Sequence, residues 1–369
     1  MIEPKSPEEL AQALADCAAA GKTIQLGGAM SKALMAGPVH SADATISTVS
    51  MNRVLQYEPA DLTISVEAGM RWTDLTSLLA GNNQIIPLDP PFAGSATVGG
   101  VVAANTSGPR RRLYGTARDV IIGMKFATLE GKLVSSGGMV VKNVAGLDMA
   151  KLMIGSFGTL AAIAVVNFKL APAPAVTRTF VLSHQKLEDA IATRDRIVQG
   201  VLQPSALDLV NSRAAERLGL SGYCVLLQAG GSEAVMERYT RELGGAEIRE
   251  DDEIWSRIRE FTPDWLREHP KGAVVRVSTT LQGLSGAMEA ASGPVVARAG
   301  NGVVYVYYSE ASQARVGDQK GAIEFAPEEA KQSLTLWPQP GSDFPVMQKI
   351  KQLFDPNALL NRGRLYGRI

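Results

Sequence analysis

Residues 95–108 read Ser-Ala-Thr-Val-Gly-Gly-Val-Val-Ala-Ala-Asn-Thr-Ser-Gly, a run of small residues with five neutral hydrogen-bonding side chains. Glycine and alanine allow a backbone to approach a bound group closely. Neutral dipoles and backbone N–H groups can hold a pyrophosphate without net positive charge. We interpret the run as a loop that binds such a group; the alternative is a polar connection between two elements.

A second run of small residues lies nearer the start of the chain. Residues 27–32, Gly-Gly-Ala-Met-Ser-Lys, follow a strand expected over 23–26. Consecutive small residues allow N–H groups to converge on an anion, and Ser31 adds a hydroxyl donor. The run matches neither the dinucleotide pattern G-x-G-x-x-G nor the P-loop. Taken alone it is equally a glycine-rich turn, but two such runs in one domain favour a phosphate-containing cofactor.

The composition narrows the class of protein. The chain has 369 residues, 46% of them hydrophobic and 20% charged, which is typical of a globular protein with room for two domains. Its 37 basic and 37 acidic residues balance, which argues against a nucleic-acid partner. Two cysteines and three scattered histidines exclude an iron–sulfur cluster and the common metal motifs, so we expect no metal. The sequence shows no signal peptide and no membrane span, so a cytoplasmic protein is expected.

The periodicity predicts two domains that differ in pattern. The first part begins with a helix capped by Ser6, and its expected strands lie over 23–26, 45–49, 62–67, 119–128, 132–135 and 161–170. Pro172-Ala173-Pro174 then indicates a boundary. Beyond it, strands over 176–182, 207–210, 224–228, 273–279, 295–299 and 303–308 alternate with helices over 187–198, 234–243, 253–261 and 281–290. This pattern indicates a separate α/β domain with an antiparallel sheet.

Short motifs recur in a fixed order along the first part. They are Gly27-Gly28, Glu67-Ala68-Gly69, 87–91 (PLDPP), 97–100 (TVGG), 104–108 (ANTSG), 141–148 (VKNVAGLD) and 155–160 (GSFGTL). In this order they resemble the FAD-binding domain of the vanillyl-alcohol oxidase and p-cresol methylhydroxylase (PCMH) family over about residues 1–171. The end, with Phe354-Asp355-Pro356 and Asn361-Arg362-Gly363-Arg364, resembles the C-terminal return of that family.

The resemblance implies an α+β, two-domain flavoprotein. Residues 1–171 would form the PCMH-type FAD-binding domain, 172–345 an α/β cap with an antiparallel sheet, and 346–369 a tail that returns to the FAD domain. The implied cofactor-binding residues are Gly27, Gly28, Ala29, Met30, Ser31, Ser95, Thr97, Gly99, Gly100, Asn105, Gly108, Gly158, Thr159, Ile163 and Asn361. Some members attach FAD covalently to a His or Cys, whereas this chain has Met30 and Ser31 in the first loop, so we expect non-covalent FAD.

The catalytic pattern of the family is altered. The larger members that oxidise 2-hydroxy acids carry H-x-G-D-G-N-L-H on a late cap strand, and residues 298–305 here read R-A-G-N-G-V-V-Y. Arg and Asn cannot replace a neutral imidazole and a carboxylate as metal ligands. The remaining weak catalytic candidates are Arg276, Arg298 and Tyr305. Arg276 is suited to a substrate carboxylate or to an acidic neighbour, and a tyrosine with a pKa of about 10 is a poor base.

The function implied by the resemblance is that of an FAD-binding subunit of a glycolate oxidase complex. A small 2-hydroxy acid would be oxidised to a 2-oxo acid, with a larger FAD-binding catalytic subunit and an iron–sulfur subunit as partners. Such a complex would hold the chain in the cytoplasm or at the inner face of the membrane. The alternatives are a self-sufficient FAD-dependent 2-hydroxy-acid dehydrogenase with a base other than histidine, and a structural subunit without FAD. We do not expect the isolated chain to turn over glycolate at a physiological rate.

Overall fold

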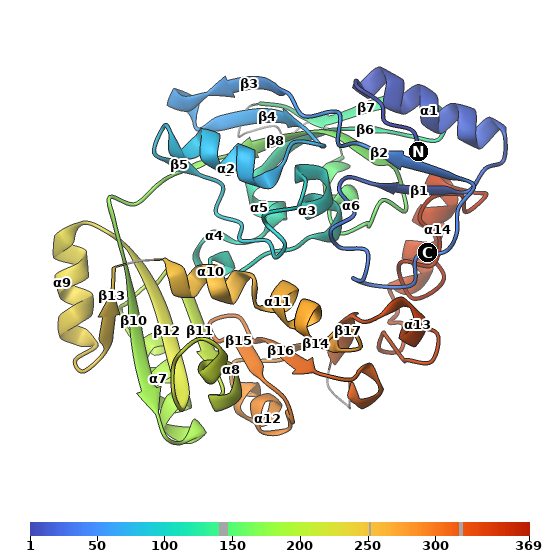
Figure 1. The fold of residues 1–369 in the computed structure, drawn as a ribbon. Coiled ribbons are helices and arrows are strands. Elements are labelled where there is room, and N and C mark those ends of the chain that lie inside the picture. The colour runs from blue at the N-terminus through green and yellow to red at the C-terminus, as the bar shows by residue number, and fades with distance from the viewer. Residues whose placement is uncertain (140–146, 251, 317–319) are drawn as a thin grey trace. The chain divides into compact units, whose positions relative to one another are not determined.

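The computed structural model describes residues 1–139, 147–250, 252–316 and 320–369, in two compact units (Figure 1). The first unit contains residues 1–106, 116–173 and 339–369, and the second contains 107–115 and 174–338. The sequence predicts boundaries at 171/172 and 345/346; the observed junctions lie at 173/174 and 338/339, and 107–115 pack with the second unit. Most of the motif at 141–148 lies outside the described residues.

The first unit is built on a five-stranded antiparallel sheet of order β3-β4-β8-β6-β7. These strands are β3 Val54–Glu58, β4 Thr63–Glu67, β6 Ile121–Ala127, β7 Leu133–Gly137 and β8 Ala162–Lys169, and β1 Ile24–Gly27 pairs in parallel with β2 Ala44–Ser47. The helices are α1 Pro7–Ala19, α2 Trp72–Ala80, α3 Val98–Ala104, α5 Ala117–Val120, α6 Ala150–Met153 and α14 Phe344–Phe354. The short pair β5 Gln84–Ile85 and β9 Ala171–Pro172 and the turn η1 Pro59–Asp61 complete the unit.

Strand β8 is buried on both faces, which explains its nearly continuous apolar sequence. Ile163 and Phe168 join the hydrophobic cluster with α2 and α3, whereas Ala162 and Ala164 join the cluster with α1. The first helix follows the prediction: the Ser6 side chain accepts a hydrogen bond from the N–H of Glu9 at 3.2 Å.

Two predictions for this unit were wrong in part. Residues 98–104 form helix α3, not a loop, because the Thr97 hydroxyl caps the N–H of Gly100 at 3.3 Å and the small residues allow close packing. A Cβ at Gly99 would lie 2.8 Å from the Cβ of Ala68. The strand predicted over 119–128 begins instead with the turn α5, where Thr116 and Asp119 form a capping box.

The second unit contains an eight-stranded antiparallel sheet of order β13-β10-β12-β11-β15-β16-β14-β17, as its alternation predicts. The strands are β10 Val176–His184, β11 Ala206–Val210, β12 Tyr223–Gly231, β13 Glu247–Arg249, β14 Ala273–Ser278, β15 Val295–Arg298, β16 Val303–Tyr308 and β17 Lys320–Phe325. Strands β13 and β17, one at each edge, were not predicted.

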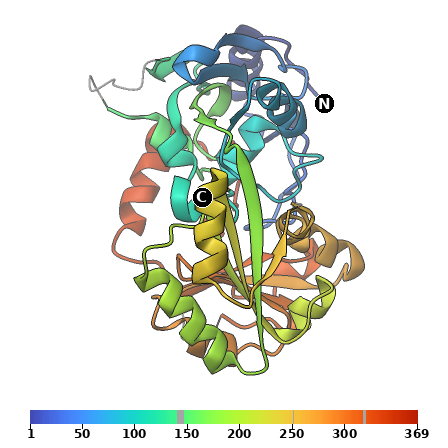
Figure 2. The same ribbon diagram turned by 90° about the vertical axis from the view of Figure 1, so that its left-hand side faces the viewer.

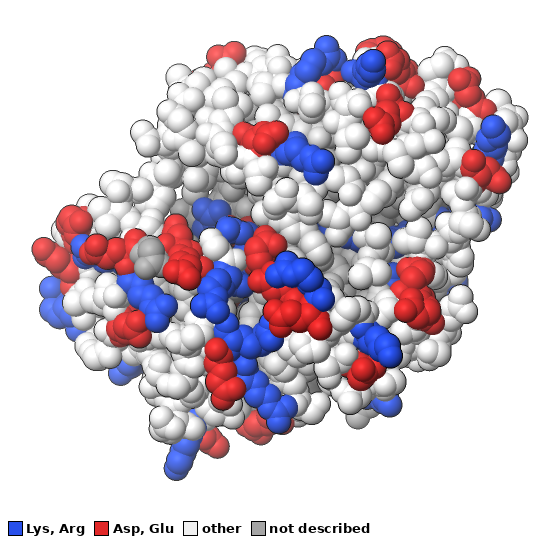
Figure 3. Space-filling view, in the orientation of Figure 1, with Lys and Arg blue, Asp and Glu red and all other residues white. Residues whose placement is uncertain are grey.

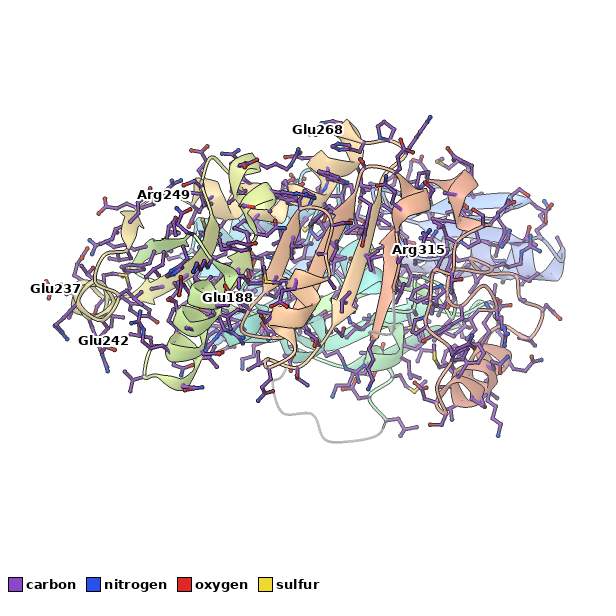
Figure 4. The ribbon with its side chains drawn as sticks, turned by 90° about the horizontal axis from the view of Figure 1, so that it is seen from below. Glu188, Glu237, Glu242, Arg249, Glu268 and Arg315 are labelled. Atoms are coloured by element: carbon purple, nitrogen blue, oxygen red, sulfur yellow. The ribbon has the colours of Figure 1, made fainter. Side chains whose placement is uncertain are left out.

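Helices cover both faces of this sheet. Helices α7 Leu187–Gln199, α9 Glu233–Glu242 and α12 Leu284–Glu289 pack on the face that holds the main core, and α9 and α7 lie beside β10 and β12 (Figures 2 and 4). The remaining elements are α4 Arg111–Tyr114, α8 Ser212–Arg217, α10 Glu253–Arg259, α11 Phe261–Glu268, η2 Ala311–Gln313 and α13 Glu328–Lys331. On the opposite face, Trp255 of α10 donates to the Thr179 hydroxyl at 2.8 Å.

The surface charges of the second unit have both signs. On the face shown in Figure 3, Lys and Arg side chains alternate with Asp and Glu side chains over this unit. Glu237 and Glu242 on α9 point away from the sheet (Figure 4). Among the described residues no helix is long and apolar enough to cross a membrane.

Candidate functional site

One pocket of the first unit brings both small-residue runs together. It has a volume of about 1060 Å³, open solvent included, and it lies between the end of β1, the loop after β1 and helix α3. Its wall is completed by Phe157, Gly158, Ala161, Ile163, Asn361, Arg362 and Arg364. The predicted site residues that line it are Gly27, Gly28, Ala29, Met30, Ser31, Thr97, Gly99, Gly100, Gly158, Ile163 and Asn361. Segments separated by most of the chain therefore meet in one pocket.

Four predicted residues are not among those that line the pocket. Ser95 is exposed in the turn before α3, where its carbonyl accepts a hydrogen bond from Arg71. Asn105 ends α3 in the left-handed conformation, with φ of 49°. Gly108 belongs to the second unit, and Thr159 is buried. None of the four lies within helix α3: Ser95 precedes its cap, Asn105 ends it, and Gly108 and Thr159 belong to other segments.

The glycines of this pocket serve two different purposes. A Cβ at Gly28 would lie 2.1 Å from the hydroxyl oxygen of Thr97, so Gly28 allows the loop after β1 to contact the start of α3. A Cβ at Gly100 would meet only that hydroxyl, at 3.2 Å, within a 4 Å radius. Gly100 therefore leaves space in the cavity itself, as a closely approaching cofactor requires.

The charges of the pocket wall suit an anionic group. Among the described residues that line it, Lys32, Arg362 and Arg364 are cationic and none is Asp or Glu. Arg364 also fixes the loop after β1, since its guanidinium donates to the carbonyls of Gly37 at 2.9 Å and Met35 at 2.6 Å. The sequence analysis quoted Lys32 in the first run but selected neither it nor Arg364, which lies 332 positions further along the chain. The residues present thus fit a diphosphate.

The C-terminal tail is fixed to this pocket by side-chain hydrogen bonds. The Asn361 amide donates to the carbonyls of Leu26 at 2.9 Å and Phe157 at 2.7 Å, and its oxygen accepts from the N–H of Leu26 at 2.7 Å. A Cβ at Gly158 would lie 2.8 Å from the Asn361 amide nitrogen. The tail therefore forms a structural part of the pocket wall.

A buried ion pair between Lys351 and Asp355 stabilises the segments that form this wall. The Lys351 ammonium donates to the Asp355 carboxylate at 2.5 Å and to the carbonyls of Thr159 at 2.7 Å and Leu360 at 3.2 Å. Burial lowers the pKa of Lys351, and the hydrogen bond and charge of Asp355 oppose that effect. The sequence analysis missed this function of Lys351, because a lysine on an amphipathic helix ordinarily faces solvent.

A second group of polar residues crosses the sheet of the second unit. Five neighbouring strands contribute one residue each to the face opposite the main core. We call this set the cap polar row; it consists of Asp208, Arg298, Tyr305, Arg276 and Glu324. Arg276 lies directly opposite Tyr305 and forms a side-chain hydrogen bond with it. Arg298 forms an ion pair with Asp208, and its guanidinium lies 5.5 Å from the Tyr305 ring centroid.

The surroundings distinguish the three catalytic candidates. Burial raises the pKa of Tyr305, so this hydroxyl stays protonated at neutral pH and can donate but not act as a base. Burial alone would lower the pKa of Arg298, but the charges of Asp208, Tyr305 and Tyr307 outweigh it, so the pKa is raised. The ion pair with Asp208 occupies this guanidinium. Arg276, which is partly exposed, is the candidate best placed to meet a ligand.

Asp208 and Glu324 are the two members that the sequence analysis missed. Glu324 lies on β17, the edge strand that was not predicted, and burial raises the pKa of its carboxyl, while Arg276 and Arg298 oppose that effect. The alternation Ile323-Glu324 on a short strand was the available signal. Within the described part of the chain, no three His, Cys, Asp or Glu side chains form a group able to hold a metal ion.

Comparisons with known proteins show which family this chain resembles. Residues 1–137 match the FAD binding domain family, and residues 334–365 match the C-terminal domain of FAD linked oxidases. The chain is 30% identical over 260 residues to the glycolate oxidase subunit GlcE of Escherichia coli (strain K12), a match that covers 69% of this chain and 67% of that protein.

Other relatives match over shorter shares of their length. A D-lactate dehydrogenase of Anaerostipes hadrus is 32% identical over 57% of this chain, but only 44% of that protein is covered. The glycolate oxidase subunit GlcD of Bacillus subtilis (strain 168) is 29% identical over 44% of this chain and 34% of its own length. A solved structure of alkyldihydroxyacetonephosphate synthase superposes with a TM-score of 0.70 at 16% identity, over 97% of this chain and 75% of that one. At this identity the superposition shows the fold.

Proposed function

Because the chain belongs to the FAD-linked oxidases of the vanillyl-alcohol oxidase and PCMH type, we propose that it is the FAD-binding subunit of a glycolate oxidase complex. In this proposal the complex oxidises a small 2-hydroxy acid to the 2-oxo acid. The observation that carries it is the similarity to GlcE over about two thirds of both chains. The two described cysteines, Cys17 and Cys224, are both buried, so an iron–sulfur partner would have to supply any cluster.

The first unit would bind the cofactor. FAD, when bound, accepts two electrons and the Cα hydrogen of the substrate. The loop at 27–31 and helix α3 would hold its diphosphate, with Lys32 and Arg362 contributing positive charge. Gly158, Ile163 and Asn361 would line the ring and the ribityl side, as the family resemblance implies. Ser95, Asn105 and Thr159 would act indirectly, by holding the ends of these segments.

The FAD of this chain is expected to be non-covalent. Met30 and Ser31 occupy the first loop, and His40 is the histidine that lines the pocket. Acid precipitation of the yellow protein should leave the colour in the supernatant. Colour that stays with the pellet would contradict the expectation, and a His40→Ala variant would then show whether this imidazole forms the bond.

The second unit would bind the substrate through the cap polar row. A carboxylate suits the guanidinium of Arg276, which can form two parallel hydrogen bonds with it. Tyr305, held protonated by burial, would donate a further hydrogen bond. Arg298 would act indirectly, by stacking on Tyr305 from its ion pair with Asp208.

Reconstitution tests the proposed function. The purified chain, loaded with FAD, is mixed anaerobically with glycolate or D-lactate, alone and together with a larger flavoprotein subunit and an iron–sulfur subunit. We expect sustained oxidation only in the complete mixture, because this chain lacks an exit for the electrons. Rapid turnover by the chain alone with an artificial acceptor would support the self-sufficient dehydrogenase. A colourless chain that takes up no FAD would support the structural subunit.

A further inference from the structure

The two ends of the cap polar row differ in access to solvent. At one end Asp208 is 0% and Arg298 is 7% exposed, and each is occupied by the other. At the other end Arg276, Tyr305 and Glu324 are only partly buried. A polar group that only stabilises a sheet does not have to be exposed to solvent. The partly exposed end is therefore the part of the row that a ligand can reach from solvent.

Strand β17 carries Glu324 two residues beyond Ala322, the residue directly opposite Arg276, and at an irregularity of the sheet. Strand β14 pairs with β17 through Val275 opposite Ile323 and Val274 opposite Phe325, so Glu324 is an additional residue on β17 at a register shift. A bulge of this kind re-aims a side chain, and bulges are over-represented next to functional sites. Glu324 and Tyr305 both act electrostatically on Arg276, from the strands on either side of it.

We infer that Arg276, Tyr305 and Glu324 form a proton-linked binding site for a small monocarboxylate. The ligand carboxylate binds to the guanidinium of Arg276 and the hydroxyl of Tyr305, and Glu324 takes up one proton as the ligand enters. This inference rests on the proposed function for its ligand class and adds the linkage to protons.

The linkage follows from two carboxylates whose charges both act on the guanidinium of Arg276. Like charges in one site disfavour each other's ionisation, so a bound carboxylate raises the pKa of Glu324 further. Burial already raises that pKa in the free protein. Protonated Glu324 then presents an O–H donor in place of a second negative charge.

The other groups around Glu324 keep their charge over the neutral range. Tyr305 and Tyr307 have raised pKa values because of burial, so both stay neutral, and the charge of Arg298 is paired with Asp208. Arg276 stays cationic, because its interactions with the Tyr305 and Glu324 side chains outweigh the effect of burial and raise its pKa. Arg111 of α4 acts on Tyr305 and is also cationic. Glu324 is therefore the group whose charge can change when a ligand binds.

The class of ligand follows from the same charges. A dicarboxylate would bring a second negative charge toward the carboxyl of Glu324, and Arg298 is already paired with Asp208. A neutral ligand would give Arg276 no counter-charge. A monocarboxylate meets one guanidinium and one hydroxyl, which matches the carboxyl end of a 2-hydroxy acid or a 2-oxo acid.

Calorimetry with pyruvate tests the inference. Pyruvate carries the carboxylate but no Cα hydrogen, so it binds without being oxidised. We titrate it into the FAD-loaded chain in two buffers of different ionisation enthalpy, across a range of pH. Between the pKa of Glu324 in the free protein and its higher pKa in the complex, uptake of about one proton per pyruvate is expected, and the affinity should fall about tenfold per pH unit; above both values uptake should cease. Pyruvamide, which is neutral, should bind at least tenfold more weakly.

Single variants test the separate contributions of Glu324 and Arg276 to pyruvate binding. Glu324→Gln keeps the shape of the side chain and should remove both the proton uptake and the pH dependence while pyruvate still binds. Arg276→Met should weaken binding at least tenfold. Glu310→Gln, an exposed glutamate of the same unit, is the matched control and should behave as the wild type. Circular dichroism and FAD content confirm that each variant is folded.

The outcomes distinguish this inference from the proposed function. Equal pyruvate affinity in the wild type and Arg276→Met, or unchanged proton uptake in Glu324→Gln, would overturn the inference even if the reconstituted complex oxidises glycolate. Proton-linked binding that requires Arg276 and Glu324 would support it, even if no complex with oxidase activity assembles; in that case the proposed function alone would fail.

Discussion

A Gly100→Val variant is expected to lose FAD binding by at least about 100-fold, or about 2.7 kcal/mol, while its apoprotein keeps the fold. Gly100 is on the face of α3 that lines the pocket, and a Cβ there would meet only the Thr97 hydroxyl, at 3.2 Å. The first added carbon requires a shift of the Thr97 hydroxyl by a few tenths of an ångström, whereas the two γ-carbons of valine would occupy space that the cofactor needs. Titration of apoprotein with FAD, followed by flavin fluorescence, measures the loss.

The neighbouring glycine provides a matched control. Gly99→Val adds the same side chain, but at Gly99 the new Cβ would lie 2.8 Å from the Cβ and 3.1 Å from the carbonyl oxygen of Ala68. We therefore expect Gly99→Val to lower the melting temperature of the apoprotein and Gly100→Val to leave it nearly unchanged. Equal destabilisation of the two apoproteins would assign Gly100 to packing and refute its role in the cavity.

Gly99 and Gly100 also show what the local sequence can and cannot predict about the backbone of this segment. The pattern of small residues at 99, 100, 103 and 104 led us to predict a loop that a cofactor approaches closely. The structure shows helix α3 there, in which Gly99 packs closely on Ala68. The helix forms because of tertiary contacts, the packing of Gly99 on Ala68 among them, and no local rule contains those.

In the second unit, the alternation of apolar and polar residues correctly predicted the strands that lie between the two edges of the sheet. Val275 and Val277 lie in the core and Arg276 between them points to the other face, as period two requires. The cap polar row itself was beyond prediction, because it depends on the order of five strands. Even the exclusion of Arg298 as a ligand-binding group required its pairing with Asp208, a residue 90 positions away.

The position of the C-terminal tail in the first unit is set by hydrogen bonds between residues that are far apart in the sequence. Asn361 bonds to Leu26 across 335 positions of sequence, and Lys351 reaches Thr159 across 192. The family resemblance indicated that the tail returns to the FAD domain. It did not indicate that a buried ion pair holds it there.

Lys351→Met is therefore expected to destabilise the first unit by about 3–5 kcal/mol, because the variant leaves the carboxylate of Asp355 buried without its cation. Asp355 is 1% exposed and retains only its hydrogen bonds from the N–H groups of Leu359 at 2.9 Å and Leu360 at 2.8 Å. Urea denaturation of the apoprotein measures the loss. Lys349→Met, an exposed lysine on the same helix, should change stability by less than about 0.5 kcal/mol.

A measurement of FAD affinity distinguishes an effect of Lys351 on the pocket from its effect on the stability of the unit. Lys351→Met also removes the donor to the carbonyls of Thr159 and Leu360, and Leu360 directly precedes Asn361 in the pocket wall. FAD affinity should therefore fall in this variant at temperatures where its apoprotein remains folded. The double variant Lys351→Met/Asp355→Asn, which removes the unpaired charge, should recover part of the stability but not the affinity, because the two carbonyls still lack their donor. Recovery of both would mean that Lys351 acts on the pocket only by keeping the unit folded.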